Sequence, residues 1–349
     1  MIITGLRGVG KTVLLGEFRE KAEAAAWVAV EAEITKHADF GVRFAQLARR
    51  ALLHVAPKAR WKDRARRAAG ILKSFTLTFS SEGALTAALD VEPVAGVADS
   101  GELAEDLSDL FVALGEAARD HDTGVVFLLD EIQYLSPRQL EALIAALHKT
   151  VQRALPVTLV GAGLPQIPRL AGEAKSYAER LFKFPRIGSL ERQQAVEALV
   201  GPAQVLGTDF TDAAADAIVD YTEGYPYFLQ EYGRTVWDEA ESSPVTTEIV
   251  EAVRPLVEAK LDDSFFRVRA ERTTRFEIRY LRAMAELGAQ PQTASDVARS
   301  LGRTSDQLGP TRSRLIDKGL LYTPGYGLAA FTVPQFDRYL LRAYPAEDS

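Results

Sequence analysis

The sequence contains no cysteine, and this absence excludes several kinds of site. A chain of 349 residues without a single cysteine has no disulfide, no thiolate metal ligand and no cysteine nucleophile. No apolar run approaches the roughly 20 residues that a membrane-spanning helix needs, and the first residues lack the pattern of a signal peptide. We therefore expect a cytoplasmic protein that does not contact membranes.

Basic residues are outnumbered in the chain as a whole, but not at its C-terminal end. The net charge of −7 argues against a protein coated in nucleic acid. From Asp263 to Ser349, 13 Lys and Arg accompany 10 Asp and Glu, a local balance of +3, so the first 262 residues carry −10. The C-terminal part is the better candidate for binding a polyanion. Another basic stretch, Lys58 to Lys73, is better interpreted as a solvated helix face than as a nucleic-acid contact.

Helix and strand patterns alternate through the first half of the chain. The composition, 47% apolar and 26% charged, is that of a globular protein, and the length suits two or three domains. This alternation predicts an α/β fold with a parallel sheet that is covered by helices on both faces. The predicted strands are Ala26–Ile34, a run from Gly124, and Pro156–Gly163; the predicted helices start at Lys11, at Phe40 and after a serine cap at Ser136.

The second half of the chain is mostly helical in pattern. Short helices with brief turns run from Glu191 to about Lys260, after a candidate strand at Arg180–Gly188. From Arg275 onward, three helices lead into a glycine-rich hairpin, which is the order of a winged helix-turn-helix. Ser74–Gly101 is predicted to be an inserted hairpin or loop. We thus predict a core over residues 1–188, a helical lid over 189–262 and a winged helix over 263–349.

The strongest motif is GLRGVGKT, which has the spacing of a phosphate-binding P-loop. Its glycines allow backbone N–H groups to surround an anion, and the following helix adds its positive end. Lys11 would reach the β- and γ-phosphates of ATP, and the Thr12 hydroxyl would join the shell of Mg²⁺. We favour nucleotide binding over a structural turn, with contacts from Gly5, Leu6, Arg7, Gly8, Val9, Gly10, Lys11, Thr12 and Val13.

A second motif, LLDEIQ, lies at the end of a strand that is apolar on both faces. Asp130 would hold Mg²⁺ through water, and Glu131 would orient or deprotonate the attacking water. The alternative is an acidic pair that caps the next helix. We favour catalysis because the pair stands on its own buried strand downstream of a P-loop.

These motifs resemble those of the AAA+ ATPases, in particular the branch that holds the archaeal initiator (origin-recognition-like) ATPases and the STAND signalling ATPases. The resemblance rests on GLRGVGKT, FLLDEIQYL, LPVTLVGAGLP, AKSYAERLF, EGYPYFLQEYG and the terminal winged helix, and it covers nearly the whole chain. It implies a P-loop AAA+ core with a helical lid, and ATP and Mg²⁺ as ligands.

The resemblance also assigns roles outside the two motifs. Gly161–Gly163 stand where many AAA+ proteins place an Asn, Ser or Thr that positions the lytic water, so we expect slow hydrolysis. Arg180 lies where an arginine finger would act on a neighbouring subunit, with an exposed helix-end cation as an equal alternative. Tyr225 and Pro226 belong to a Gly-x-Pro motif that implies contact with base and ribose; the alternative is a plain helix start.

The expected recognition helix of the winged helix, Ser305–Lys318, would present Gln307, Thr311, Arg312 and Arg314. Arg303 precedes this helix, and Tyr326 marks the tip of the wing. Arginines at such positions contact phosphates and guanine edges of duplex DNA. The helix also carries Asp306 and Asp317, and many winged helices dock on proteins, so both alternatives stay open.

We therefore expect an ATP-binding and slowly ATP-hydrolysing switch, in which Mg·ATP between core and lid holds the lid closed and hydrolysis through Glu131 releases it. One alternative is an initiator- or transposition-helper-like protein whose ATP state controls DNA binding. Another is a STAND-type scaffold that forms a homo-oligomer or binds a protein partner. A degenerate adaptor without nucleotide is the least favoured.

The P-loop begins unusually early, because only Met1–Thr4 precede Gly5. In related ATPases the segment ahead of this strand helps to enclose the adenine. Our hypothesis is that the chain is N-terminally truncated, or that its start codon was placed at an internal Met.

Overall fold

The parallel sheet at the N-terminal end organises the first of two units. The computed structural model describes residues 1–36, 39–79 and 91–345. Unit 1 comprises Met1–Thr4 and Lys11–Arg186, and unit 2 comprises Gly5–Gly10 and Ile187–Ser349. Each unit is described by itself below.

Four parallel strands form the sheet of unit 1, in the order β1-β4-β3-β2. Their bounds are Ile2–Thr4 for β1, Val28–Glu33 for β2, Val125–Asp130 for β3 and Val157–Gly163 for β4. Beside β1, the N–H groups of Ile2 and Thr4 donate to the carbonyls of Lys183 and Pro185, each at 2.8 Å. The candidate strand at 180–188 is wrong in its first part, because Arg180 and Leu181 end helix α8 (Ala178–Leu181); the segment joins the sheet only through a single parallel bridge between Thr4 and Arg186.

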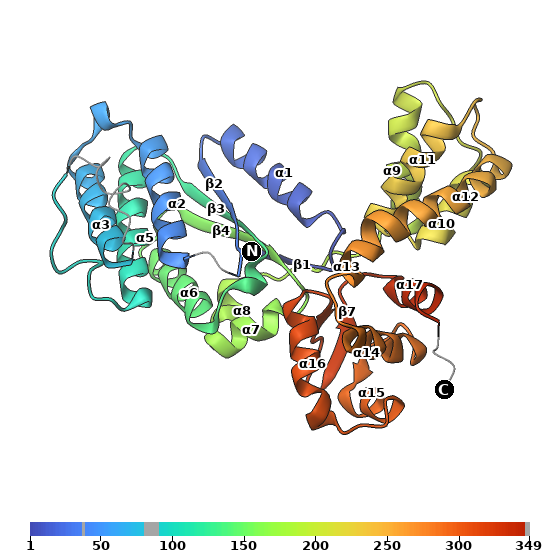
Figure 1. Ribbon diagram of the computed structural model, residues 1–349. Helices are drawn as coiled ribbons and strands as arrows, with labels where there is room; N and C mark the ends of the chain where they lie inside the picture. The colour runs from blue at the N-terminus through green and yellow to red at the C-terminus, as the bar shows by residue number, and fades with distance from the viewer. Residues whose placement is uncertain (37–38, 80–90, 346–349) are drawn as a thin grey trace. The chain divides into compact units, whose positions relative to one another are not determined.

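Helices cover both faces of this sheet, as the alternating pattern predicts. Helix α1 packs against β2, β3 and β4, whereas α2, α5 and α6 share a core with the opposite face of β3 (Figure 1). In that core the rings of Phe111 and Phe127 stack at 4.7 Å. The helices of unit 1 are α1 (Lys11–Ala24), α2 (Phe40–Val55), η1 (Lys58–Arg60), α3 (Asp63–Phe79), α5 (Leu103–Asp120), η2 (Ile132–Tyr134), α6 (Pro137–Gln152), α7 (Ile167–Ala174) and α8 (Ala178–Leu181).

The predicted hairpin or loop at Ser74–Gly101 is wrong in its first part. Ser74–Phe79 continues α3, because Leu72, Phe75 and Phe79 recur at helical spacing and Phe75 is fully buried. Residues 80–90 of this prediction lie outside the described residues. On the same helix Arg64, Arg66 and Arg67 are exposed, which agrees with a solvated face.

Unit 2 is built from short helices and one small sheet. Strands β5 (Gln292–Thr293), β7 (Leu328–Phe331) and β6 (Leu321–Tyr322) are antiparallel in that order. The fully buried rings of Tyr225, Tyr232 and Phe336 lie in its core. Its helices are α9 (Arg192–Val205), α10 (Asp212–Thr222), α11 (Pro226–Glu239), α12 (Thr247–Leu261), η3 (Asp262–Arg267), α13 (Val268–Ala270), α14 (Arg275–Glu286), α15 (Ala294–Ser300), α16 (Ser305–Asp317) and α17 (Phe336–Ala343).

The helical pattern predicted from Glu191 to Lys260 is thus present as α9–α12, and the pattern predicted from Arg275 is present as three helices with a β-hairpin. None of the helices within the described ranges is both long enough and apolar enough to cross a bilayer.

Candidate functional site

The end of β3 and the start of α1 bring a hydroxyl and a carboxylate together in unit 1. The strand ends at Asp130 and the helix begins at Lys11, so Thr12 lies in the first turn. The Thr12 hydroxyl donates to Asp130 Oδ2 at 2.6 Å, and the Glu131 N–H donates to Asp130 Oδ1 at 2.8 Å. Lys11 is 7% exposed, whereas Thr12 is exposed. The two residues predicted as Mg²⁺ ligands are therefore in direct contact.

The oxygen atoms of Thr12 and Asp130 suit a hard divalent cation. Mg²⁺ prefers oxygen ligands and is usually held by one or two carboxylates together with water and substrate phosphates. Within the described ranges no group of three or more His, Cys, Asp or Glu could hold a metal ion. These residues fit a cation that is completed by nucleotide phosphates rather than by a cage of protein ligands.

Glu131 is held beside this pair by a residue that the sequence analysis missed. Its backbone has a left-handed conformation (φ +55°), and one of its carboxylate oxygens accepts from the side-chain amide of Gln133. Gln133 Oε1 in turn accepts from the N–H of Leu164 at 3.1 Å, directly after β4. The only sequence signal was the glutamine in LLDEIQ, which has no partner until β3 and β4 are placed side by side.

The loop Gly5–Gly10 lies within unit 2, although Lys11 and Thr12 belong to unit 1. Gly8 and Gly10 have φ values of +84° and +89°, a region that L side chains rarely adopt. Val9 is 7% exposed and belongs to the core of unit 2, and Leu6 packs against that core. The Arg7 N–H donates to the carbonyl of Thr332 at 3.3 Å. The P-loop sequence is therefore anchored by side chains and backbone of unit 2.

Tyr225 and Gly8 lie against each other in unit 2. A Cβ added at Gly8 would lie 3.2 Å from the Tyr225 hydroxyl and 3.1 Å from Tyr227 Cβ. Tyr225 is 2% exposed, burial raises the pKa of its hydroxyl, and that hydroxyl has no hydrogen-bond partner within the described residues. Pro226 begins α11. Two residues that the sequence assigned to the nucleotide, Gly8 and Tyr225, are therefore neighbours.

Two other predicted site residues lie on exposed surfaces. Val13 is 71% exposed on α1. Arg180 is exposed in the last turn of the short helix α8, and it forms no ion pair within the described part of the chain. Its position is compatible with a finger that acts on a second copy and equally with a helix-end cation.

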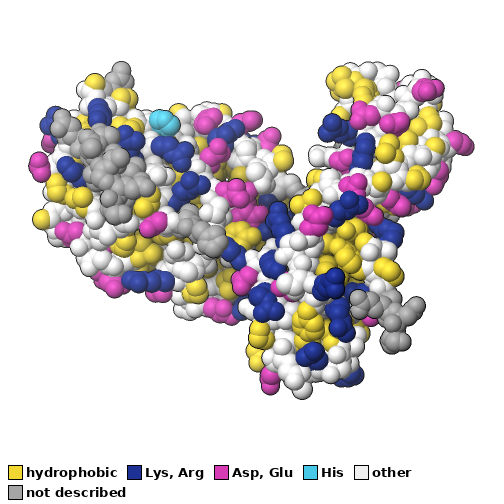
Figure 2. Space-filling model, in the orientation of Figure 1, with side chains coloured by type: hydrophobic (Ala, Val, Ile, Leu, Met, Phe, Trp, Pro, Cys, Tyr) yellow, Lys and Arg dark blue, Asp and Glu magenta, His cyan; other side chains and the backbone are white. Residues whose placement is uncertain are grey.

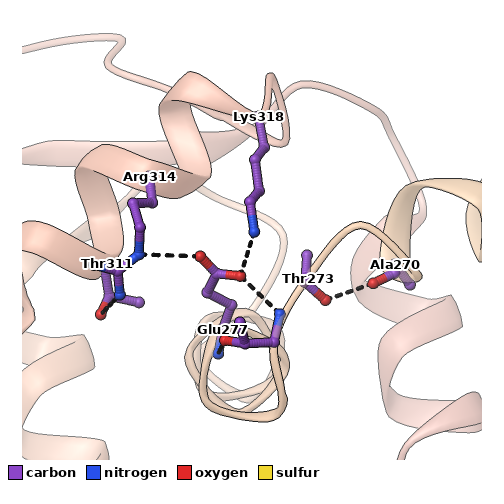
Figure 3. A network of polar contacts seen from close by, with 7 residues as sticks. Ala270, Thr273, Glu277, Thr311, Arg314 and Lys318 are labelled. Atoms are coloured by element: carbon purple, nitrogen blue, oxygen red, sulfur yellow. Dashed lines mark hydrogen bonds and ion pairs between the residues drawn. The ribbon is translucent and has the colours of Figure 1, made fainter.

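A buried carboxylate organises the C-terminal helices (Figure 3). The side chain of Glu277, on α14, is fully buried. Its oxygens accept from Lys318 Nζ at 2.6 Å, from Arg314 Nε at 3.3 Å and from the Thr274 N–H at 2.7 Å. Burial acts to raise the pKa of Glu277, but the bonds from Lys318 and Thr274 and the charge of Lys318 outweigh it and lower that pKa.

Of the predicted DNA-contact residues of α16, Thr311 and Arg312 bond within the protein, whereas Gln307 and Arg314 are exposed. Arg312 donates to the carbonyls of Gly327 at 3.3 Å and Leu328 at 2.5 Å, and Arg314 donates to Glu277. Thr311 is 3% exposed and accepts from Arg314 at 3.0 Å, so the expectation that this helix presents Thr311 is wrong. Its side chain is turned toward the network around Glu277 (Figure 3).

Arg303 differs from the arginines of α16. It is exposed, and its guanidinium lies over the ring of Phe276 at 5.2 Å from the ring centroid. Tyr326 is fully exposed between β6 and β7.

Comparison with known proteins finds two family models, each of which matches a different part of the chain. Residues 1–160 match the family model described as AAA ATPase domain. Residues 263–340 match a domain of unknown function, DUF8462. No curated protein matches the chain.

Several solved structures resemble this chain. The chain is similar to the Walker-type ATPase PABY2304 of Pyrococcus abyssi, at 15% identity and a TM-score of 0.55, over 97% of this chain and 90% of that one. The RuvB Holliday junction branch migration motor of Thermotoga maritima (17% identity, TM-score 0.43, 99% and 87% covered) and the Orc1 protein of Aeropyrum pernix in complex with DNA (15%, 0.41, 98% and 86%) are too distant to support an argument.

Proposed function

We propose that this chain, which carries the P-loop fold of the AAA+ ATPases, binds Mg·ATP and hydrolyses it slowly as a nucleotide-dependent switch. The observation that carries this proposal is the contact between Thr12 and Asp130 with Glu131 directly beside them. This arrangement brings a hydroxyl and two carboxylates, one of which would bind Mg²⁺, to the carboxyl end of one strand, and it supports the proposal.

Each residue has a separate task in this proposal. Lys11 binds the β- and γ-phosphates as a cation, and the backbone N–H groups of the loop orient them. Thr12 would hold Mg²⁺ directly and Asp130 through water, and the metal would neutralise charge on the phosphates. Glu131 orients the attacking water and accepts its proton as the water oxygen attacks the γ-phosphorus, while the bond from that phosphorus to the bridging oxygen breaks and ADP leaves.

The switch follows from the position of the motif in the chain. The motif that would bind the phosphates runs without a break in the sequence from Gly5–Gly10, which belong to unit 2, into Lys11–Thr12, which belong to unit 1. Loss of the terminal phosphate removes contacts that differ between the two nucleotide states, which is the requirement for a population shift.

The first test compares binding with turnover. Lys11→Ala should weaken ATP binding by at least about 100-fold, because it removes charge-assisted bonds worth about 3 kcal/mol or more. Glu131→Gln should retain binding of ATP and lose phosphate release. Lys21→Ala, which removes an exposed cation from the last turn of α1, is the matched control. Unchanged phosphate release in both site variants would contradict the proposal.

An assembly role is tested in the same samples. Light scattering with ADP and with a slowly hydrolysed ATP analogue measures whether the nucleotide changes the oligomeric state. If Arg180 acts on a neighbouring copy, Arg180→Ala should lower turnover only under conditions in which oligomers form. Equal loss of turnover in the monomer would contradict that role.

A second candidate function, binding of duplex DNA by a C-terminal winged helix, is supported by unpaired arginines. Within the described ranges, Arg275, Arg279 and Arg303 form no ion pair, whereas Arg299 and Arg338 pair with Asp296 and Glu223. Arg275 and Arg279 line one cleft of unit 2, and Arg303 stacks on the neighbouring Phe276. Figure 2 shows Lys and Arg side chains over the elements that surround this cleft. The charge available to phosphates is on α14 and before α16.

This function predicts a specific salt dependence. Each arginine that neutralises a phosphate contributes about −0.9 to the slope of log K against log salt, so Arg275→Gln with Arg279→Gln should reduce the slope by about two. Arg299→Gln with Arg338→Gln removes the same formal charge from ion-paired positions and is the control. Equal effects of the two pairs would show a response to net charge alone and contradict the assignment.

A further inference from the structure

Gln133 connects the candidate catalytic carboxylate to the neighbouring strand. We propose that Gln133 is a positioning residue for hydrolysis: its side-chain amide holds the Glu131 carboxylate in place against the end of β4. This inference rests on the proposed ATPase function and adds a residue to it. It also explains how the Gly-Ala-Gly end of β4, which has no polar side chain, is compatible with an oriented carboxylate.

The orientation of the Gln133 amide follows from its two partners. The Leu164 N–H can only donate, so the Gln133 oxygen must face it, at 3.1 Å. An ionised carboxylate can only accept, so the Gln133 NH₂ group must face Glu131 Oε2. Flipping the amide would place an NH₂ group against an N–H and an oxygen against a carboxylate. One orientation therefore satisfies both contacts, and the amide is a rigid link between them.

The glycine at the end of β4 provides the space for this link. A Cβ added at Gly163 would lie 2.8 Å from Gln133 Oε1, closer than real Cβ contacts, and 3.1 Å from Ile132 Cγ1. Any side chain at position 163 would therefore displace the Gln133 amide. Conversely, the amide occupies the volume into which a polar side chain from β4 would project.

Glu131 needs such support because its own backbone places it on a sharp turn. Its φ of +55° is uncommon for a residue other than glycine, and η2 begins directly after it. Glu131, Asp130 and Gln133 are half-buried, so solvent reaches the carboxylate and packing alone does not select its rotamer. The bond from Gln133 selects one position for Glu131 and leaves Oε1 for the water.

The experiment separates hydrogen bonding from packing. Gln133→Ala removes the amide, and Gln133→Met keeps the length of the side chain without its polar atoms. Both should lower kcat by about 10- to 100-fold, because a displacement of the order of 1 Å in a reacting group has effects of this size. KM and the affinity for a slowly hydrolysed ATP analogue should stay within about twofold, because the hydrogen-bond partners of the amide, Glu131 and Leu164, lie outside the P-loop. Gln152→Ala, an exposed position on α6, is the control.

Moving the side-chain amide from position 133 to position 163 provides the decisive test. Gly163→Asn alone should lower kcat, because its side chain collides with Gln133. In the double variant Gln133→Ala with Gly163→Asn, the new amide occupies the vacated volume, and kcat should recover to at least about threefold above the Gln133→Ala single variant. Thermal unfolding confirms that each variant is folded.

Three results would overturn the inference. Unchanged kcat in Gln133→Ala and Gln133→Met, increased kcat in either, or additive losses in the double variant would each show that Gln133 does not position Glu131. A wild-type chain that binds ATP but shows no phosphate release would contradict the proposed hydrolysis, and this inference with it. If the wild-type chain hydrolyses ATP and the Gln133 variants have the same kcat, this inference alone is contradicted.

Discussion

The two units use carboxylates in opposite ways. In unit 1, Asp130 and Glu131 are half-buried at a strand end and accept few bonds, so each has oxygen lone pairs left over. In unit 2, Glu277 is fully buried and accepts from Lys318, Arg314 and a backbone N–H. A carboxylate with spare acceptor capacity can hold a cation or water, whereas a saturated one stabilises the fold.

The arginines of the C-terminal helices show the same division. Arg312 and Arg314 on α16 bond to carbonyls and to Glu277, and these contacts connect α16 with α14 and the β-hairpin. Arg275, Arg279 and Arg303 form no ion pair within the described ranges and remain at the surface. Of the two arginines on the expected recognition helix, Arg312 is half-buried and bonds to two carbonyls, whereas Arg314 stays exposed while it bonds to Glu277.

The largest expected effect concerns the unsaturated carboxylate of unit 1. Asp130→Asn should lower ATP turnover by about 100-fold, because it weakens the Mg²⁺ site, while changing the free energy of unfolding by less than about 0.5 kcal/mol. Phosphate release across a magnesium titration, with urea unfolding of the same protein, measures both quantities. Asp109→Asn removes a carboxylate that pairs with Lys149 on the surface of the same unit and should leave turnover unchanged. A large loss of unfolding free energy in Asp130→Asn would show that this carboxylate stabilises the fold, as Glu277 is expected to do, and would contradict the difference between the two units.

The next effect concerns the saturated carboxylate of unit 2. Glu277→Ala should lower the free energy of unfolding by about 2 kcal/mol, because it leaves Lys318 and the Thr274 N–H without their buried partner; the exposure of Arg314 moderates the loss. ATP turnover per folded molecule should not change. The control is Asp263→Ala, which breaks an exposed pair with Arg267 and should cost less than about 0.5 kcal/mol. If the two variants lose the same unfolding free energy, the buried contacts of Glu277 contribute no more to stability than an exposed ion pair does.

Each unit contains a helix with a capping box, and removing the cap should cost a similar, smaller amount of unfolding free energy in both units. Ser136 caps α6 and Thr304 caps α16, and the N–H of each cap residue donates to the side-chain oxygen of a glutamine three residues later. Ser136→Ala and Thr304→Ala should each cost about 1 kcal/mol of unfolding free energy. Unfolding that is monitored separately in the two units would sharpen the comparison, because each variant should affect its own unit first. A cost confined to one of the two positions would show that tertiary packing, rather than the cap, determines the loss.

The smallest expected effect is a pH dependence in unit 2. The pKa of Glu277 is lowered from its ordinary value of 4.5, so its contribution to stability is present above that value and is lost as the pH falls through the lower folded pKa. Between about pH 6 and about pH 3, the wild-type chain should therefore lose more stability than Glu277→Gln, which cannot titrate. Urea midpoints at the two pH values measure the difference. Equal acid sensitivity in both proteins would mean that other carboxylates account for the whole pH dependence.

Much of the fold and part of the site could be predicted from the sequence. The parallel sheet could be predicted because β3 and β4 are short apolar runs, which is typical of strands with both faces buried. In the structure these two strands are the central strands of the sheet. The helix that starts at Pro137 was readable from its serine cap. The hairpin predicted at Ser74 failed because a small-residue composition was weighed above the helical spacing of Phe75 and Phe79.

The candidate site was predicted only where its residues are close in sequence. Gly5–Thr12 and Asp130–Glu131 are contiguous motifs whose local geometry follows from their residue types. The roles of Tyr225, Pro226 and Arg180 were inferred from resemblance and stay predictions. Gln133 was missed because its acceptor and donor lie on two different segments.

The sequence by itself determined which functional groups the chain has and the local turns, caps and strands that hold them, because these depend on neighbouring residues. Tertiary structure decided which of these groups are bonded within the protein and which can still bind a cation, water or a partner. The hydrogen bond between Leu164 and Gln133 joins residues that are 31 positions apart in the sequence, and the bond between Lys318 and Glu277 joins residues that are 41 positions apart. Such pairs are set by the register of strands and the packing of helices, and hydrogen bonds act only over a few ångströms. The same carboxylate chemistry therefore gives an open site in one unit and a closed structural network in the other.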